Sequence, residues 1–294
     1  MKYLTLGEYL KKTYGFKAYK IAIDIGCTCP TRDGKIDTRG CIFCSQSGSG
    51  DYAQNRKYSV TKQIKMGKTL VEKKNPSGKY IAYFQNFTNT YGDEETLREK
   101  YLEAVDHPDV CIISIATRPD CLSERMYEIL AECNKIKPVW VELGLQTIKE
   151  ESIKYIRRGY ENIVYENAVK RLKEYLPDSQ IITHVILGLP GENIEDMKRT
   201  VEYVVRSGAT GIKLQLLHVL EDTDLYDDYK TGKFKVMTED EYIETLKAVL
   251  TKVPENMVIH RLTGDGDKKI LCAPLWSGNK RHVYNRIKKE VLKV

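Results

Sequence analysis

Three cysteines near the amino end of this 294-residue chain are spaced so that their thiolates could hold one metal centre. Cys41 and Cys44 form a CxxC pair, and Cys29 lies twelve residues before Cys41, across a stretch that contains Gly34 and Gly40. A flexible loop of this kind lets the third thiolate fold back onto the pair. Three thiolates suit an iron–sulfur cluster and leave one iron without a protein ligand.

Two other kinds of site use the same residue types. A structural zinc site closes on four ligands, and Cys27 could supply the fourth, although there is no second CxxC and the nearest histidine is His107. A thioredoxin-type CxxC stands at a helix start directly after a strand and needs no cysteine upstream. An open iron–sulfur cluster on Cys29, Cys41 and Cys44 is the preferred interpretation, with Cys27 as the alternative to Cys29.

The rest of the chain alternates between strand-like and helix-like segments. Short, nearly continuous apolar runs predict six strands, at Lys20–Ile25, Tyr80–Gln85, Val110–Ala116, Val139–Leu145, Ile181–Leu187 and Gly211–Leu217. Amphipathic segments predict six helices, near Val60–Glu72, Glu94–Val105, Glu124–Cys133, Ile163–Tyr175, Ile194–Arg206 and Glu239–Thr251. This α/β alternation indicates a parallel sheet with helical crossovers, either partly closed like a TIM barrel or flat.

The cysteines lie in the longest stretch without predicted structure, roughly residues 26–58, which follows the first strand. A loop this long inside a compact domain is usually functional. In both forms of the sheet, ligands bind at the carboxyl ends of the strands. We therefore expect the cysteine loop to border the binding site.

Composition describes a soluble globular protein, with 41% hydrophobic and 30% charged residues. The charged amino end contains no secretory signal, and no run of about 18 apolar residues predicts a membrane span. We expect a cytoplasmic location, where disulfides are rare. No role is assigned to the cysteines outside the loop, which are Cys111, Cys121, Cys133 and Cys272.

The net charge of +6 is concentrated at the carboxyl end. Residues 266–294 hold eight basic and two acidic side chains, so residues 1–265 are neutral overall. We expect a core domain over 1–265 and a basic extension over 266–294. Trp276 and Tyr284 lie among the cations, so this extension could offer stacking as well as phosphate contacts to RNA. A solvated helix explains the charge equally well.

The cysteine loop and several motifs resemble one enzyme superfamily. The spacing Cys29-x(11)-Cys41-x2-Cys44, with the aromatic Phe43, is similar to the cluster loop of radical S-adenosylmethionine (SAM) enzymes. Its wide first gap resembles the branch of the Elongator catalytic subunit, and within it the MnmL-like (YtqA-type) family. Further blocks resemble that family in order: YFQNFTNTY (83–91), ATRPDCL (116–122), ELGLQT (142–147), HVILGLPGE (184–192) and APLW (273–276).

The resemblance implies a partial (βα)6 TIM-like barrel, the radical SAM core. It also implies a 4Fe-4S cluster on Cys29, Cys41 and Cys44, whose open iron binds SAM and splits it reductively to a 5′-deoxyadenosyl radical. A barrel interior covered by loops keeps such a radical away from water.

The same resemblance implies seven SAM contacts. Phe43 would contact the adenine, and Gln85 and Asn86 would meet the methionine amino group at the end of the second strand. Gly188 would allow the backbone to approach the ligand closely. Gln146 and His184 would contact the ribose region, and the guanidinium of Arg158 would fork onto the SAM carboxylate.

Relatives of this branch imply a tRNA substrate, namely the C5 side chain of wobble uridine 34, which would receive or remodel an aminomethyl-type group. A flavodoxin or ferredoxin would donate the electron, and a downstream methyltransferase could finish the product. Two alternatives stay open: a radical SAM enzyme for a small molecule such as a tetrapyrrole, and a non-enzymatic RNA-binding module with a structural metal site.

Overall fold

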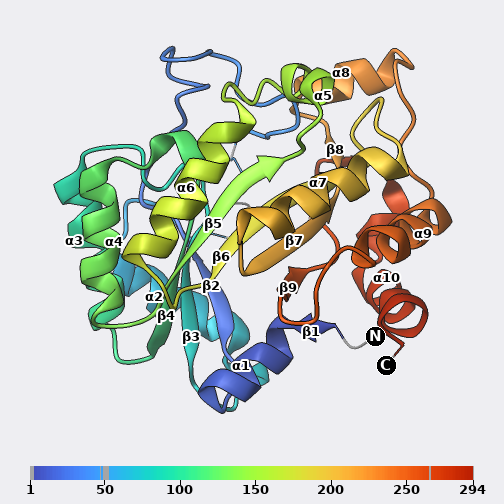
Figure 1. Cartoon of the computed structure of the whole chain (residues 1–294). Helices are drawn as coiled ribbons and strands as arrows, with labels where there is room; N and C mark the ends of the chain where they lie inside the picture. The colour runs from blue at the N-terminus through green and yellow to red at the C-terminus, as the bar shows by residue number, and fades with distance from the viewer. Residues whose placement is uncertain (1–2, 47, 49–52, 265, 294) are drawn as a thin grey trace.

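An eight-stranded parallel sheet forms the centre of the molecule, as the computed structural model shows for residues 3–46, 48, 53–264 and 266–293 (Figure 1). Its strand order is β1-β9-β7-β6-β5-β4-β3-β2. The bounds are β1 Leu4–Thr5, β2 Tyr19–Ile23, β3 Tyr80–Phe84, β4 Val110–Thr117, β5 Val139–Gln146, β6 Ile181–Leu187, β7 Gly211–Leu216 and β9 Val258–Arg261. A separate antiparallel pair joins β8 (Val219–Leu220) to β10 (Leu271–Ala273).

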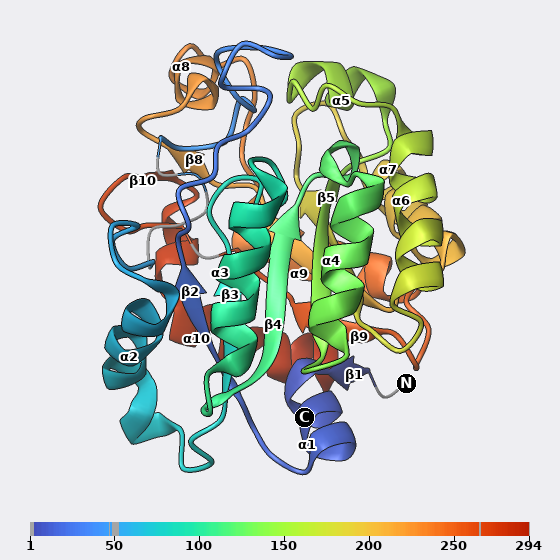
Figure 2. The same cartoon turned by 90° about the vertical axis from the view of Figure 1, so that its left-hand side faces the viewer.

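Six helices cross from one sheet strand to the next, and Figure 2 shows α3, α4 and α6 along the outer face of the sheet. They are α2 Val60–Val71, α3 Glu94–Asp106, α4 Glu124–Asn134, α6 Asn162–Tyr175, α7 Ile194–Ser207 and α9 Glu239–Leu250. Shorter α-helices are α1 Leu6–Tyr14, α5 Glu150–Tyr155, α8 Asp224–Lys230 and α10 Lys280–Arg286. The predicted strand–helix alternation and partial barrel are confirmed.

Side-chain caps fix where these crossover helices begin. The side chains of Ser59, Asp93 and Ser123 accept a hydrogen bond from a backbone N–H in the first turns of α2, α3 and α4. Asn193 and Thr238 do the same for α7 and α9, and each forms a reciprocal capping box. Such caps stabilise a helix by about 1 kcal/mol each, so the turn residues help to set the spacing of the barrel.

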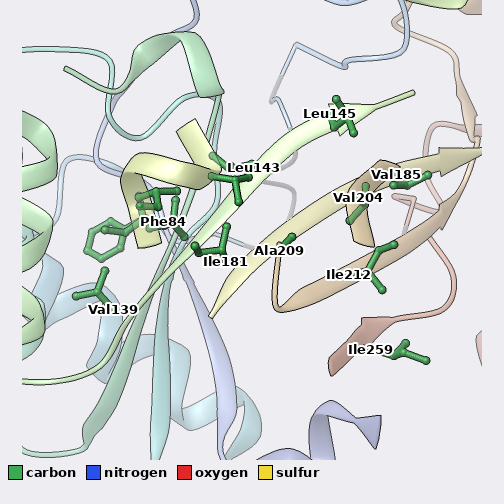
Figure 3. Close-up of a cluster of buried hydrophobic side chains, with 14 of the residues drawn as sticks. Phe84, Val139, Leu143, Leu145, Ile181, Val185, Val204, Ala209, Ile212 and Ile259 are labelled. Carbon is green, nitrogen blue, oxygen red and sulfur yellow. The ribbon is translucent and has the colours of Figure 1, made fainter. Parts of the chain in front are cut away.

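Alternate residues of each strand face opposite sides of the sheet. The outward residues pack against the helices, and Figure 3 shows Leu143 and Leu145 of β5, Val185 of β6 and Ile212 of β7 in this layer. All four are buried. The residues between them point into the barrel, so the interior carries a different set of side chains.

Helix α1 closes the lower end of the barrel interior (Figure 1). Its Leu10 is buried with Ile112, Trp140 and Ile182 of the strands, and the ring of Tyr9 lies 6.1 Å from that of Trp140. Strand β1 directly precedes α1 and pairs with β9. These elements were not predicted, and they extend the six predicted strands to eight.

The carboxyl-terminal segment packs into the same structure. Strand β10 pairs with β8, and Val283, Ile287 and Val291 of α10 and the following π-helix (Ile287–Leu292) are buried in the main core. The domain boundary at 265/266 stays a prediction. In the part of the chain that the structure describes, no helix combines the length and apolar character that a membrane span needs.

Candidate functional site

The three cysteines of the loop meet at one pocket at the carboxyl ends of the strands. Cys29, Cys41 and Cys44 all line it, together with residues from the ends of β3, β4, β5 and β6. In both views the loop after β2, drawn in blue, lies at the upper end of the molecule with α5 and α8 (Figures 1 and 2). The expected position of the loop over the strand ends is therefore observed.

Backbone hydrogen bonds close the wide gap between Cys29 and Cys41. The N–H of Gly40 donates to Thr31 O at 2.7 Å, which joins the two ends of the intervening segment. Arg32 then spans it, because its guanidinium donates to Cys44 O at 2.8 Å and Ser45 O at 2.7 Å. Gly40 has a φ of +74°, and a Cβ there would stand 2.8 Å from Arg32 Nε. A glycine is needed at this position.

Cys29 and Cys27 occupy different environments. The sulfur of Cys29 lies 2.8 Å from Thr88 Oγ1, and Thr88 N–H donates to Thr28 O at 3.2 Å, which joins the cysteine loop to the segment after β3. Cys27 is buried in the main hydrophobic core, where burial raises the pKa of its thiol to about 12, and it does not line the pocket. This arrangement supports Cys29 as the third ligand.

A closed zinc site is not seen in the described residues. Within 3–46, 48, 53–264 and 266–293, no three side chains from His, Cys, Asp and Glu converge on a position for a single ion. Cys29, Cys41 and Cys44 are free thiols around a shared pocket. Burial raises the pKa of Cys29 and raises that of Cys41 to about 12, so a bound cation is needed to keep these sulfurs as thiolates. The donor set fits an iron–sulfur cluster.

Five of the seven predicted SAM residues line the same pocket: Phe43, Gln85, Gln146, Arg158 and His184. The other two lie outside its lining. Asn86 is buried and donates to the Asp24 carboxylate at 2.8 Å. Gly188 has a φ of +90° at the end of β6, and a Cβ there would meet the side chain of Met237.

Gln146 ends β5 in a left-handed conformation, with a φ of +64°. When its amide is oriented to satisfy both polar atoms, the nitrogen donates to Gly144 O at 2.8 Å and Leu145 O at 3.0 Å. A non-glycine residue in this region is strained, and such strain gathers at ligand sites. The geometry turns the chain sharply at the pocket wall.

Arg158 is buried, and protein acceptors surround its guanidinium. It donates to Leu145 O at 3.1 Å, Thr147 O at 2.8 Å and Tyr160 O at 2.7 Å, and to the Asn162 side chain at 2.9 Å. These bonds hold the loop after β5 in place. A direct contact from Arg158 to the SAM carboxylate stays a prediction.

Below the pocket, a buried carboxylate collects polar side chains from the other strands. Glu142 of β5 accepts from Ser114 at 2.6 Å, from Tyr83 at 3.1 Å and from Lys20 at 2.5 Å. Lys213 of β7 also donates to it, and His184 Nε2 lies 2.7 Å from Glu142 Oε2. Each of the strands β2 to β7 therefore supplies one residue to the set that is centred on Glu142. We call this set the interior polar cluster.

The charges in the interior polar cluster shift one another's pKa values. Burial opposes ionisation of Glu142, but Lys20 and Lys213 outweigh it and hold the pKa of the carboxyl well below its usual range. Burial, together with the charge of Lys213, lowers the pKa of His184 to about 4. His184 is therefore neutral near pH 7 and donates from Nε2, since Gln215 Nε2 faces its Nδ1 at 3.5 Å.

Several residues in and below the pocket stand in recognisable sequence patterns, although no role was assigned to them from the sequence. Arg118, in the ATRPDCL block, bonds both carboxylate oxygens of Asp120 and donates to Arg158 O at 2.8 Å. Tyr160 lies between the two guanidiniums, 5.2 Å from that of Arg118 and 4.2 Å from that of Arg158. Lys20 and Lys213 stand inside apolar strand runs, where a charge is unusual enough to mark an interior function.

A partial barrel that gathers three thiols and a polar pocket at its strand ends defines a class of metal-dependent enzymes with the active site over the barrel mouth. The chain belongs to the radical SAM superfamily. The model of that superfamily matches residues 38–204, and the model of the Radical_SAM C-terminal domain matches residues 209–293. Membership implies a 4Fe-4S cluster and SAM, and it makes the protein an enzyme.

Among curated proteins, the chain is 40% identical to the uncharacterized protein YtqA of Bacillus subtilis, over 99% of this chain and 89% of that protein. It is 31% identical to the protein YhcC of Escherichia coli, over 93% and 87%. It is also 30% identical to the tRNA uridine(34) acetyltransferase of Methanocaldococcus infernus, over 57% of this chain and 31% of that enzyme. These relatives support the Elongator-like branch.

Solved structures share the fold. The archaeal Elp3 of Methanocaldococcus infernus superposes with a TM-score of 0.68 at 20% identity, over 94% of this chain and 64% of that one. Coproporphyrinogen III oxidase of Escherichia coli, a radical SAM enzyme, superposes with a TM-score of 0.54 at 11% identity, over 83% and 54%. At these identities, the likeness concerns the barrel alone.

Proposed function

We propose that this radical SAM enzyme modifies tRNA at the C5 side chain of wobble uridine 34, where it forms or remodels an aminomethyl-type group. The observation that carries this proposal is the 30% identity to a tRNA uridine(34) acetyltransferase over 57% of the chain. The chain spans about a third of that relative's length. We therefore carry over from this relative only the modified nucleoside, uridine 34, and we propose no acetyl transfer.

In this proposal Cys29, Cys41 and Cys44 hold the cluster, and Phe43, Gln85, Gln146 and His184 bind SAM at the pocket that all of them line. When bound, the cluster supplies the electron that splits the sulfonium of SAM. The chain's own part is to orient SAM and exclude water. Thr88 and Arg32 fix the loop, and the buried strand ends form the floor. A flavodoxin or ferredoxin would deliver the electron.

The basic carboxyl end offers a surface for the tRNA backbone. Arg281, Lys288 and Lys289 are exposed and form no salt bridge within the described residues. Arg286, in contrast, pairs with Glu239, Asp240 and Glu290 and helps to attach α10 to α9. We define Arg281, Lys288 and Lys289 as the basic face.

The two aromatic residues of this segment differ in exposure. Trp276 packs against the main core, with its ring 5.8 Å from that of Tyr242, and its N–H donates to Met237 O at 3.0 Å. Tyr284 is 53% exposed beside Lys288. Tyr284 is therefore the better candidate to stack on a base.

The proposal is tested by mass spectrometry of tRNA nucleosides from a strain that lacks the gene. We expect the loss of one modified uridine at position 34 and the build-up of its precursor. The anaerobically reconstituted enzyme, given SAM, a reductant and that tRNA, should convert the precursor and release 5′-deoxyadenosine. Unchanged tRNA nucleosides in the deletion strain would contradict the proposal and favour a small-molecule substrate.

A further inference from the structure

A second pocket lies beside the one that holds the three cysteines. The two share Phe43, Cys44, Tyr83, Gln85 and His184 as lining residues, so they meet at the cluster loop. The second pocket continues over β7 and β9, where Lys213, Gln215 and Arg261 line it. Cys44 is the one cluster cysteine in its lining, so this space lies to the side of the cluster.

The lining of this second pocket is cationic. Its described lining residues include Lys213 and Arg261 and no aspartate or glutamate, while His184, which also lines it, is neutral near pH 7. Lys213 and Arg261 are register partners on β7 and β9, which places their side chains next to each other. The guanidinium of Arg261 has no hydrogen-bond or ion-pair partner among the described residues. A half-buried guanidinium without an acceptor is costly unless a ligand supplies one.

The charges behind the pocket do not balance either. Glu142 is the single acid of the interior polar cluster, and it already accepts from Lys20 and Lys213. Even if Lys213 is neutral, the charges of Lys20 and Arg261 exceed that of Glu142. Since Lys20 alone matches the charge of Glu142, the unmatched positive charge that faces the pocket among the described residues is that of Arg261.

We propose that this second pocket binds an oxyanion of the substrate, a carboxylate or a phosphate, between Arg261 and Lys213. The proposal rests on the proposed function, because it takes the anion to belong to the tRNA. The planar fork of Arg261 suits both oxyanions. Since Phe43 and Cys44 border both pockets, an anion held there fixes the rest of the substrate beside the cluster.

The direct test is anion binding to the reconstituted holoenzyme. Acetate and inorganic phosphate are titrated separately by calorimetry, with chloride added to constant ionic strength. At least one of the two anions should bind. The anion that binds more tightly identifies the substrate group as a carboxylate or a phosphate. Arg261→Gln should weaken that binding by tenfold or more, and Arg261→Lys by less. Arg206→Gln, which removes an exposed arginine on α7, should bind as the unmodified protein does.

Four results would overturn the proposal. Acetate and phosphate could both bind no better than chloride, or Arg261→Gln could leave the binding unchanged. Alternatively, Asp265, which lies outside the described residues, could be the partner of Arg261. In that case anions would bind only after Asp265→Asn. A loss of SAM affinity in Arg261→Gln equal to the loss of anion affinity would assign Arg261 to the SAM site instead.

Measurements of tRNA modification by the Arg261→Gln variant distinguish a failure of this proposal from a failure of the proposed function. If tRNA is modified and Arg261→Gln raises its KM tenfold or more, both stand. If tRNA is modified equally well by Arg261→Gln, the anion site fails while the function stands. If no tRNA is modified but Arg261→Gln still abolishes acetate or phosphate binding, the function fails and the anion site belongs to another substrate.

Discussion

His184 Nε2 lies 2.7 Å from Glu142 Oε2, and the two side chains join neighbouring strands inside the barrel. Glu142 is fully buried and His184 is mostly buried. Because Gln215 approaches the other ring nitrogen, the imidazole is fixed as the Nε2–H tautomer. His184 also lines the pocket of the cluster cysteines. The interior polar cluster therefore sets the orientation and charge of a residue that lines the pocket.

Glu142→Gln should strongly destabilise the protein. The change leaves Lys20 and Lys213 without their shared carboxylate in a buried site, and removing one partner of a buried ion pair costs about 3–5 kcal/mol. Urea denaturation of the cluster-free protein measures the loss. The control is Glu195→Gln, which breaks an exposed pair with Lys198 and should cost less than about 1 kcal/mol. Equal effects of the two substitutions would contradict the prediction.

Acid should destabilise the fold through His184. Its pKa is 6.5 in the unfolded chain and about 4 in the folded protein, so the unfolded state binds a proton that the folded state does not. The free energy of unfolding therefore falls as the pH drops from 6.5 to 4, by about 3 kcal/mol from this group. His184→Gln should reduce the slope over this range, and His260, whose pKa burial also lowers well below its usual value, should keep the rest of it. A His184→Gln variant with the same slope as the unmodified protein would contradict the prediction.

The sequence predicted the repeated part of the barrel well. Each of the six strands was placed within about two residues because continuous apolar runs and capped helices are local patterns. For example, the run Ile181–Leu187 coincides with β6. Strand β1 has two residues and pairs with β9 more than 250 positions later, so its local pattern is too short to predict it. The capping box of Thr5 and Glu8 could have revealed α1.

The orientation of side chains in the strands was the main feature of the site that the sequence did not predict. Strands covered on both faces read as apolar throughout, so the position of Glu142 did not tell whether it faces the barrel or solvent. Only the folded sheet shows that Glu142 contacts Lys213, which lies 71 positions later in the sequence. The sequence revealed the cysteine loop because metal binding by its cysteines depends on their spacing along the chain. It did not reveal how Arg32 and Gly40 close the loop, because those contacts form only in the folded protein.

Cluster assembly should depend on Cys29, Cys41 and Cys44. Replacing any of them by alanine should abolish iron and sulfide binding and the visible charge-transfer absorption of the anaerobically reconstituted protein. Cys27→Ala should keep them, because Cys27 is buried in the main core away from the pocket. A cluster that survives Cys29→Ala but disappears in Cys27→Ala would reverse the assignment.

Arg158→Lys should lower the free energy of unfolding by about 2 kcal/mol. A lysine cannot donate to Leu145 O, Thr147 O and Tyr160 O at once, so buried carbonyls lose their partners. Chemical denaturation measures this effect, and Arg125→Lys on the exposed face of α4 is the control. SAM affinity of the folded variant tests the predicted carboxylate contact, and an unchanged affinity would show that Arg158 only holds the loop.

The basic face should control how steeply tRNA binding depends on salt. Changing Arg281, Lys288 and Lys289 together to Gln removes three exposed cations, and each lost phosphate contact lowers the log–log salt slope by about 0.7–0.9. Fluorescence anisotropy of labelled tRNA over a KCl series should therefore show a slope smaller by about 2.

The control for the basic face is the triple change of Lys11, Lys12 and Lys17 to Gln. These residues are exposed on and just after α1, at the opposite end of the barrel from the cysteine loop (Figure 1). Both triple variants lose the same charge, so a general effect of net charge would change both slopes equally. A reduction confined to the basic face places the tRNA there, because counterion release depends on local contacts. Equal slopes in the two variants would mean that the tRNA docks elsewhere.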